Sequence, residues 1–362
     1  MDDGLPLVSL VIPCRNEAGT ITDTIRSLLA QNYPAEKLEL IFVDGMSTDG
    51  TRELIAQSSK SRVHGFPVFR LLDNPAKITA VALNKGVSAA KGEVIFTMGA
   101  HTRYSPNYIS EAMNALCLFG ADAVGSVART VPGGSTPIAR AIALALGSRF
   151  GVGPSLMRTG TNKLRSADTA SCPGYRRMVF TRVGLFNPNL VRNQDIDFNI
   201  RLRRSGLRLL LHPGIKSYYR ARPTLSGLFQ NSFANGYWVI RGIKFSSRPF
   251  ALRHLIPGLF VGALLVSIAP LLAAASTPFI WLPPVLLVGG YLVADVAAAL
   301  HRIFATRSSF RLLPELLVVF PTLHIGYGLG SLWALGTLWH TPRQNTGGAG
   351  ALGIATCPSG KQ

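Results

Sequence analysis

Apolar runs typical of strands alternate with helix-like stretches along the first third of the chain. The strand-like runs are VSLVIP (8–13), LELIFVD (38–44), FPVFRLLD (66–73) and GEVIFTM (92–98). Each run is followed by a stretch of mixed apolar and polar residues, as in a helix that covers a sheet. This alternation is typical of β-α-β units on a mainly parallel sheet. We therefore predict an α/β fold whose ligands bind beyond the carboxyl ends of the strands.

Three long apolar runs follow residue 253. Residues 255–276 carry no charge, residues 279–300 contain only Asp295, and residues 316–339 contain His324 but no Asp, Glu, Lys or Arg. Each run could cross a hydrocarbon core of roughly 30 Å as a helix. No amphipathic segment remains to cover them in a soluble core. The pattern therefore predicts a membrane region at 251–340 with about three transmembrane helices, followed by a flexible, Gly-rich tail at 341–362.

Basic residues flank the predicted spans on one side. Lys and Arg precede the first span and fill the loop between the second and third, whereas the link at 277–278 is uncharged. The positive-inside rule places both basic segments in the cytoplasm. The start of the sequence lacks the basic and long apolar regions of a signal peptide. We expect a multi-pass protein of the bacterial inner (cell) membrane, with residues 1–250 as a cytoplasmic catalytic domain.

The composition changes this picture little. Charged residues make up 15% of the chain and hydrophobic residues 48%, whereas roughly 25% charged residues is usual for a soluble domain. These proportions exclude a disordered chain. The four cysteines are scattered, with no paired spacing, which argues against a disulfide scaffold or a zinc module.

The positive charge is concentrated in one part of the chain. Of the formal net charge of +19, +18 lies between Val124 and Arg253, where the only acidic residues are Asp168, Asp195 and Asp197. A stretch this basic attracts nucleic acid, a nucleotide diphosphate, a lipid diphosphate or an anionic bilayer, unless it only keeps the surface soluble. Aromatic residues do not alternate with the basic ones in a stacking pattern, so we expect no nucleic acid.

Polar residues follow the first two predicted strands. Asp44 ends an apolar strand, which favours ligand binding, whereas Asp49 precedes a helix and favours an N-cap. Neither GxGxxG nor GxxxxGK[ST] is present, which argues against a dinucleotide enzyme and a P-loop ATPase.

Four segments carry a family resemblance. VSLVIPCRNE, IFVDGMSTDGT, GEVIFTMGAHTRYSPNYI and VRNQDIDFNIRLRRSG, in this order and spacing, resemble family 2 inverting glycosyltransferases with the Rossmann-like GT-A fold. The resemblance covers residues 7 to about 245. SADTASCPGYRRMVF, Asn193-Gln194-Asp195 and HIGYGLG are similar to succinoglycan-type exopolysaccharide glucosyltransferases. This implies transfer of a sugar, glucose first of all, with inversion from a UDP-sugar to a lipid-diphosphate-linked saccharide, alongside other polysaccharide assembly proteins.

The resemblance also assigns roles to residues. Asp195 occupies the position of the catalytic base, where a carboxylate typically supplies 10²–10⁴-fold in rate. Surrounding Arg side chains should keep Asp195 ionised, and a salt bridge such as one to Arg201 is the alternative role. Glu17 could instead cap the following helix. The implied nucleotide-sugar-binding residues are Pro13, Asn16, Glu17, Asp44, Lys77, Ala100 and His101, and the implied acceptor-side residues are Arg176, Arg177, Gln194 and Trp238.

Two positions depart from the family pattern. The Gln-x-x-Arg-Trp element of processive relatives is replaced around Gln230 and Trp238, so we expect one sugar to be added per encounter. The metal-binding Asp-x-Asp falls on Gly99-Ala100-His101, where the subgroup usually has Asp-Ala-His. A divalent cation, Mn²⁺ more readily than Mg²⁺, would then depend on His101 and phosphate oxygens. Metal-free transfer, with Arg and Lys holding the diphosphate, is the second outcome.

Two other functions remain open. A polyprenyl-phosphate mannosyl- or glucosyltransferase differs only in its acceptor. The loss of a carboxylate at Gly99 would also suit a catalytically impaired membrane protein that binds a nucleotide sugar without turning it over.

Overall fold

The computed structural model describes residues 4–60, 68–245, 252–273 and 281–338. Within these residues nine strands form one sheet, in the order β3-β2-β1-β4-β8-β6-β9-β5, with β7 paired to β9. The strands are β1 (Val8–Cys14), β2 (Leu38–Asp44), β3 (Val68–Asp73), β4 (Val94–Thr97), β5 (Thr102–Tyr104), β6 (Ala123–Val131), β7 (Arg165–Ser166), β8 (Ser171–Arg176) and β9 (Leu209–Arg220). The predicted α/β fold is confirmed.

Strand direction divides the sheet into two parts. Strands β3, β2, β1 and β4 are mutually parallel, as the alternating pattern predicts. Strand β8 is antiparallel to both β4 and β6, whereas β6 and β9 are parallel. The carboxyl ends of β1, β2 and β4 therefore meet at one edge, while β8 ends at the opposite edge.

Helices cover both faces of the sheet, because successive strand side chains point to opposite sides. Val8, Leu10 and Ile12 of β1 join one hydrophobic core, and Val11 joins the other. We call the part of the chain before residue 246 the front domain. Its helices are α1 (Ile21–Leu29), α2 (Thr51–Lys60), α3 (Thr79–Ala89), α4 (Tyr108–Leu118), α5 (Pro137–Leu146), α6 (Arg149–Val152), α7 (Leu156–Thr159), α8 (Arg177–Val183), α9 (Gln194–Arg204) and α10 (Leu225–Arg241).

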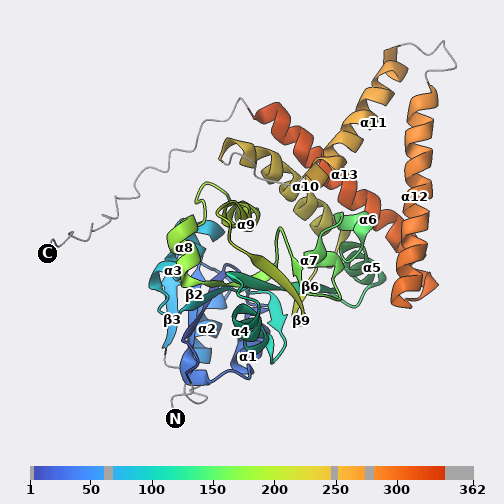
Figure 1. Ribbon diagram of the computed structural model, residues 1–362. Helices are drawn as coiled ribbons and strands as arrows, with labels where there is room; N and C mark the ends of the chain where they lie inside the picture. Colours follow the sequence, from blue (N-terminus) through green and yellow to red (C-terminus); the bar gives the residue numbers. More distant parts are fainter. Residues whose placement is uncertain (1–3, 61–67, 246–251, 274–280, 339–362) are drawn as a thin grey trace.

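Three helices near the end of the chain extend away from the sheet (Figure 1): α11 (Ile256–Ala273), α12 (Leu282–Thr306) and α13 (Leu313–Thr337). By length and composition, two described segments could cross a membrane, Leu282–Thr306 and Phe310–Thr337. The described apolar part of α11, Ile256–Ile268, is shorter. Two of the three predicted spans thus coincide with helices that are long and apolar enough to cross a membrane, and the predicted tail lies outside the described residues.

Two polar side chains of the C-terminal helices, His324 and Asp295, differ in their hydrogen bonding. The Nε2 of His324 lies 2.8 Å from the carbonyl oxygen of Phe150 and its Nδ1 lies 2.9 Å from the hydroxyl of Tyr291. His324 therefore links α13 to both α6 and α12. Asp295 is fully buried, and its carboxylate has no hydrogen-bond partner among the described residues.

Glycines let α10 and α13 pack backbone against backbone. A Cβ atom at Gly236 would lie 2.0 Å from the carbonyl oxygen of Tyr327, and one at Gly330 would lie 2.0 Å from that of Phe233. Only glycine fits at such distances, as in close helix pairs within membranes. Gly330 belongs to the HIGYGLG segment. The contact joins the front domain to the C-terminal helices.

We predict that Gly330→Ala destabilises the protein, because the added methyl group forces α10 and α13 apart. Such overpacking costs roughly 1–3 kcal/mol. Thermal unfolding of the full chain in detergent measures the effect. Gly336→Ala is the matched control, since it lies on the same helix and its added Cβ meets no atom within 4 Å. Equal unfolding temperatures for the two variants would contradict the close contact.

Candidate active site

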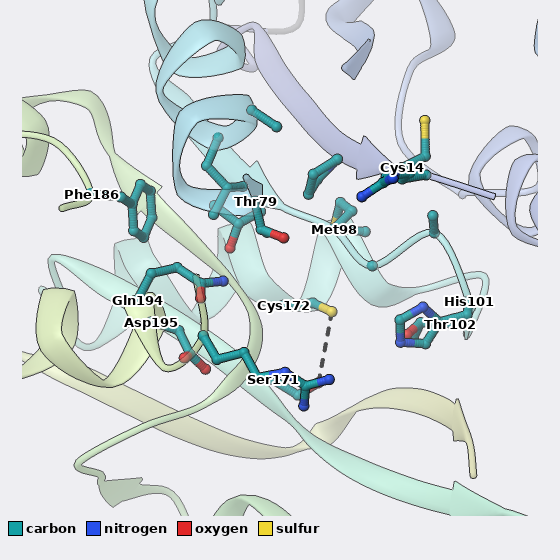
Figure 2. Close-up of a pocket in the computed structure, with 18 of the residues that line it drawn as sticks. Cys14, Thr79, Met98, His101, Thr102, Ser171, Cys172, Phe186, Gln194 and Asp195 are labelled. Atoms are coloured by element: carbon teal, nitrogen blue, oxygen red, sulfur yellow. Dashed lines mark hydrogen bonds between the residues drawn. The ribbon is translucent and has the colours of Figure 1, made fainter. Parts of the chain in front are cut away.

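A cavity of about 520 Å³ lies beyond the carboxyl ends of β1, β2 and β4. We call it the main pocket. Residues after these strands form one wall, and the start of α9 and β8 form the other. Figure 2 shows Gln194 and Asp195 across the pocket from Cys14 and His101. Of the residues predicted from sequence, seven line the pocket: Pro13, Glu17, Lys77, Ala100, His101, Gln194 and Asp195.

Asp195 lies in the first turn of α9 and is partly exposed to the main pocket. Asn193, immediately before the helix, has a left-handed backbone (φ 61°), which turns the chain into α9. Arg201 forms its salt bridge with Asp197, with Nε to Oδ2 at 3.0 Å. The alternative role for Asp195, an ion pair with Arg201, is therefore wrong.

Burial raises the pKa of Asp195 above its ordinary value. Backbone N–H groups of Ile196 and Asp195 and the charge of Arg158 act in the opposite direction but do not outweigh burial. Arg158 thus favours the ionised form of Asp195, as expected of a nearby arginine, but burial has the larger effect on its pKa. A carboxylate that is harder to ionise binds a proton more strongly, which suits a general base.

Glu17 and His101 pair across the rim of the pocket. The Nδ1 of His101 lies 3.0 Å from Oε1 of Glu17, and the hydroxyl of Thr20 donates to Oε2 at 2.8 Å. Burial alone would raise the pKa of Glu17, but the hydrogen bonds from His101 and Thr20 and the charge of His101 lower it. Glu17 thus lines the pocket and contacts the hydroxyl of Thr20 at the start of α1, but its side chain accepts no hydrogen bond from a backbone N–H of that helix, so the capping alternative is not supported.

Asp44 and Asn16 do not line the main pocket, contrary to prediction. Asp44 is fully buried, and its Oδ2 accepts hydrogen bonds from the backbone N–H of Ser47 at 3.0 Å and from Arg52 at 2.8 Å. The Oδ1 of Asn16 accepts a hydrogen bond from the N–H of Thr48 at 2.9 Å. Asp44 therefore stabilises the loop after β2, and Asn16 joins the loops after β1 and β2.

Arg176 and Arg177 lie at the opposite edge of the sheet, so their predicted acceptor-side position is wrong. Arg176 donates to the carbonyl oxygens of Ala121 and Leu116, and Arg177 donates to that of Gly92. The reason is that β8 runs antiparallel to β4 and ends at the far edge.

Trp238 is not among the residues that line the main pocket, in contrast to Asn235 on the same helix, α10. The indole of Trp238 packs edge-on against Tyr237, with ring centroids 5.7 Å apart. Its predicted position on the acceptor side of the pocket is therefore not supported.

Three arginines and a lysine line the main pocket: Arg15, Lys77, Arg158 and Arg192. Arg192 is held by Asn231 and Asn235, at 3.0 and 2.9 Å. The guanidinium of Arg158 lies 4.3 Å from the ring centre of Tyr219. Of the four, sequence reasoning singled out only Lys77. Arg15 and Arg192 lie within the segments that carry the family resemblance, whereas no motif marks Arg158.

The residues around Gly99 do not make up a metal site. Gly99 has no side-chain ligand, and Nδ1 of His101 is engaged with Glu17. Within the described residues, no group of three or more His, Cys, Asp or Glu side chains could hold a metal ion.

Comparison with known proteins adds to this geometry. The sequence profile of "Glycosyl transferase family 2" matches residues 9–184. The chain is 27% identical over 324 residues to "Succinoglycan biosynthesis protein ExoA" of Rhizobium meliloti (strain 1021), covering 89% of this chain and 92% of the relative. It is 24% identical over 331 residues to the "Dolichyl N-acetyl-alpha-D-glucosaminyl phosphate 3-beta-D-2,3-diacetamido-2,3-dideoxy-beta-D-glucuronosyltransferase" of Methanococcus voltae, covering 89% and 95%.

A solved structure supports the fold. The mannosyltransferase PcManGT from Pyrobaculum calidifontis, in complex with GDP-Man and Mn²⁺, matches with a TM-score of 0.53 and 18% identity, over 91% of this chain and 88% of that chain. At this identity the likeness concerns the fold alone. The profile places a family 2 glycosyltransferase domain at residues 9–184, and the protein has the GT-A fold.

Proposed function

We propose that the protein transfers glucose with inversion from UDP-glucose to a lipid-diphosphate-linked saccharide in exopolysaccharide biosynthesis. One observation carries the proposal: the carboxylate of Asp195 faces a pocket that is lined by four cationic side chains. The relatives support a lipid-linked acceptor in polysaccharide biosynthesis, because one is named for succinoglycan biosynthesis and the other for a dolichyl-linked sugar phosphate.

In this proposal Asp195 is the general base. Its carboxylate takes the proton of the acceptor hydroxyl as the hydroxyl oxygen bonds to the anomeric carbon of the donor. The bond from that carbon to the diphosphate breaks on the opposite face, so UDP leaves and the configuration inverts. A base within reach of the hydroxyl typically contributes 10²–10⁴-fold in rate.

The cationic side chains would stabilise the negative charge that develops on the leaving diphosphate. Arg15 and Lys77 approach from the β1 and β3 side of the pocket, and Arg158 and Arg192 approach from the α7 and α9 side. Burial and the nearby charge of Arg222 lower the pKa of Arg192. A bound anion would act in the opposite direction and favour the charged guanidinium. Fixed charges aimed at a developing oxyanion are an efficient source of catalysis.

We further propose that α12 and α13 lie in the bacterial inner membrane and hold the active site at its cytoplasmic face. Exposed apolar side chains on α12, such as Val285, Leu286 and Val293, support this placement. Each Lys or Arg close to an anionic surface adds on the order of 1 kcal/mol to its attraction. A lipid-linked acceptor would thereby be kept within reach of the main pocket.

A second candidate rests on Gly99. Without the carboxylate that relatives carry, the protein could bind a nucleotide sugar and organise polysaccharide assembly without catalysis. This candidate requires nucleotide binding by calorimetry without release of UDP under any metal. The acceptor could also be a polyprenyl phosphate. Thin-layer analysis of the labelled lipid product would distinguish a sugar on a lipid monophosphate from an oligosaccharide on a lipid diphosphate.

The first prediction concerns the base. Asp195→Asn should lower kcat for transfer from labelled UDP-glucose at least about 10²-fold, because the amide cannot take up the proton. Binding of UDP, measured by calorimetry, should change less than about twofold. Asp23→Asn is the control, because Asp23 is exposed and pairs with Arg26 outside the main pocket. Turnover retained in Asp195→Asn would remove Asp195 as the base.

A second prediction follows from the raised pKa of Asp195. Below the ordinary Asp pKa of 3.8, both the folded and the unfolded chain bind the proton, so the ionisation of Asp195 does not oppose folding. As the pH rises from there through the folded-state pKa, the wild type loses stability and Asp195→Asn does not. The variant should therefore unfold at a higher temperature than the wild type at neutral pH.

The same titration should govern activity in the opposite direction, since only the ionised carboxylate accepts a proton. Thermal unfolding from pH 3.5 to 8 and kcat/KM over the same range test both trends. If the difference in unfolding temperature does not change with pH, burial does not control the ionisation of Asp195.

A third prediction concerns the missing carboxylate. Gly99→Asp should raise the Mn²⁺ affinity of the UDP-bound protein about tenfold or more, since charged oxygen ligands set cation affinity. The new Cβ would lie 2.9 Å from Oγ1 of Thr102, so the side chain of Thr102 must shift in any variant with a side chain at this position. Gly99→Asn is the matched control, with the same shape but no charge. Equal Mn²⁺ affinities in titration calorimetry would mean that the comparison with the metal motif is misleading.

A further inference from the structure

A second cavity, of about 490 Å³, lies beside the main pocket. We call it the basic cavity. Its walls come from β6, α7 and β9 of the front domain, from α5, and from the last turns of α12. In Figure 1, α5, α6 and the carboxyl end of α12 gather beside β6 and β9.

The charge of the basic cavity has one sign. Arg129, Arg158, Lys216 and Arg302 line it, and no Asp or Glu is present among its described lining residues. None of the four forms a salt bridge with a carboxylate within the described part of the chain. Neutral hydrogen-bonding groups of Thr130, Thr159, Thr161 and Asn162 complete the lining. Like charges gathered without counterions in a concave site focus a positive potential, which favours an anion.

Two cations connect this cavity to its surroundings. Arg158 lines both the basic cavity and the main pocket. Arg302 lies on α12, one of the helices that could cross a membrane, and its Nε donates to the carbonyl oxygen of Leu144 on α5 at 3.0 Å. The basic cavity therefore adjoins the catalytic pocket on one side and the end of a candidate membrane helix on the other.

We propose that the basic cavity binds the diphosphate group of the lipid-linked acceptor. The lipid chain would follow α12 toward the bilayer, and the saccharide would pass Arg158 toward Asp195. Arg and Lys bind phosphate oxygens through charge-assisted hydrogen bonds, the strongest kind available here. The inference rests on the proposed function, because it assigns the site that would take the acceptor.

The test uses the full chain in detergent micelles and three probes: farnesyl diphosphate, inorganic pyrophosphate and UDP. The variant is Arg129→Gln/Lys216→Gln, which removes two charges from the basic cavity but none from the main pocket. The single variant Arg129→Gln serves if the double variant unfolds at a lower temperature. Arg140→Gln is the matched control, since Arg140 is exposed on α5 and does not line the cavity.

We expect farnesyl diphosphate to bind the wild type more tightly than pyrophosphate, because its tail adds apolar contacts. In the double variant its Kd should rise about tenfold or more, while the Kd of UDP should change less than about twofold. Arg140→Gln should leave both unchanged.

Four results would overturn the assignment. An unchanged farnesyl diphosphate affinity in the double variant would mean that the cavity does not bind the lipid diphosphate. An equal loss for UDP would make the cavity part of the donor site, and an equal loss in Arg140→Gln would indicate general surface electrostatics. Pyrophosphate binding as tight as that of farnesyl diphosphate would indicate a free phosphate. Failure of glucose transfer would affect the proposed function but not these binding measurements.

Discussion

Parallel pairing of β1 with its two neighbours is the constraint on which the site depends. In register, Cys14 of β1 lies beside Asp44 of β2, and Val11 lies beside Thr97 of β4. Three loops separated by some 30 to 80 residues of sequence therefore leave the sheet at one edge. That edge supplies one wall of the main pocket, and the first turn of α9 supplies the other with Asp195.

The sequence predicts the position of a side chain where that position follows from strand order. Pro13 lies in the pocket because it is close to the carboxyl end of β1, and Lys77 and His101 because they follow β3 and β4; the alternating pattern predicts these parallel strands. Arg176 was misplaced because local sequence does not reveal that β8 runs against β4. The predicted position of Asp44 in the pocket was wrong because its carboxylate is buried and bonded to Ser47 and Arg52. These contacts form only in the folded chain, so the local sequence does not reveal them.

The basic excess seen in the sequence is divided in space between two cavities that share Arg158. No periodic pattern marks this residue, since it lies on the short helix α7 between the recognisable motifs. Its position depends on the packing of α7 against β6 and on the aromatic face of Tyr219. Composition indicated that an anion would bind, but only the fold separates one anion-binding cavity from the other.

The glycine contact between α10 and α13 has a consequence for the size of the product. Main chain packed on main chain holds the two helices at a short separation. If α13 is embedded as proposed, the reactive carboxylate stands at a constant height above the lipid surface. An oligosaccharide rooted in that surface would be extended only when its terminal sugar reaches this height. The contact between α10 and α13 would then limit each oligosaccharide to the addition of one sugar.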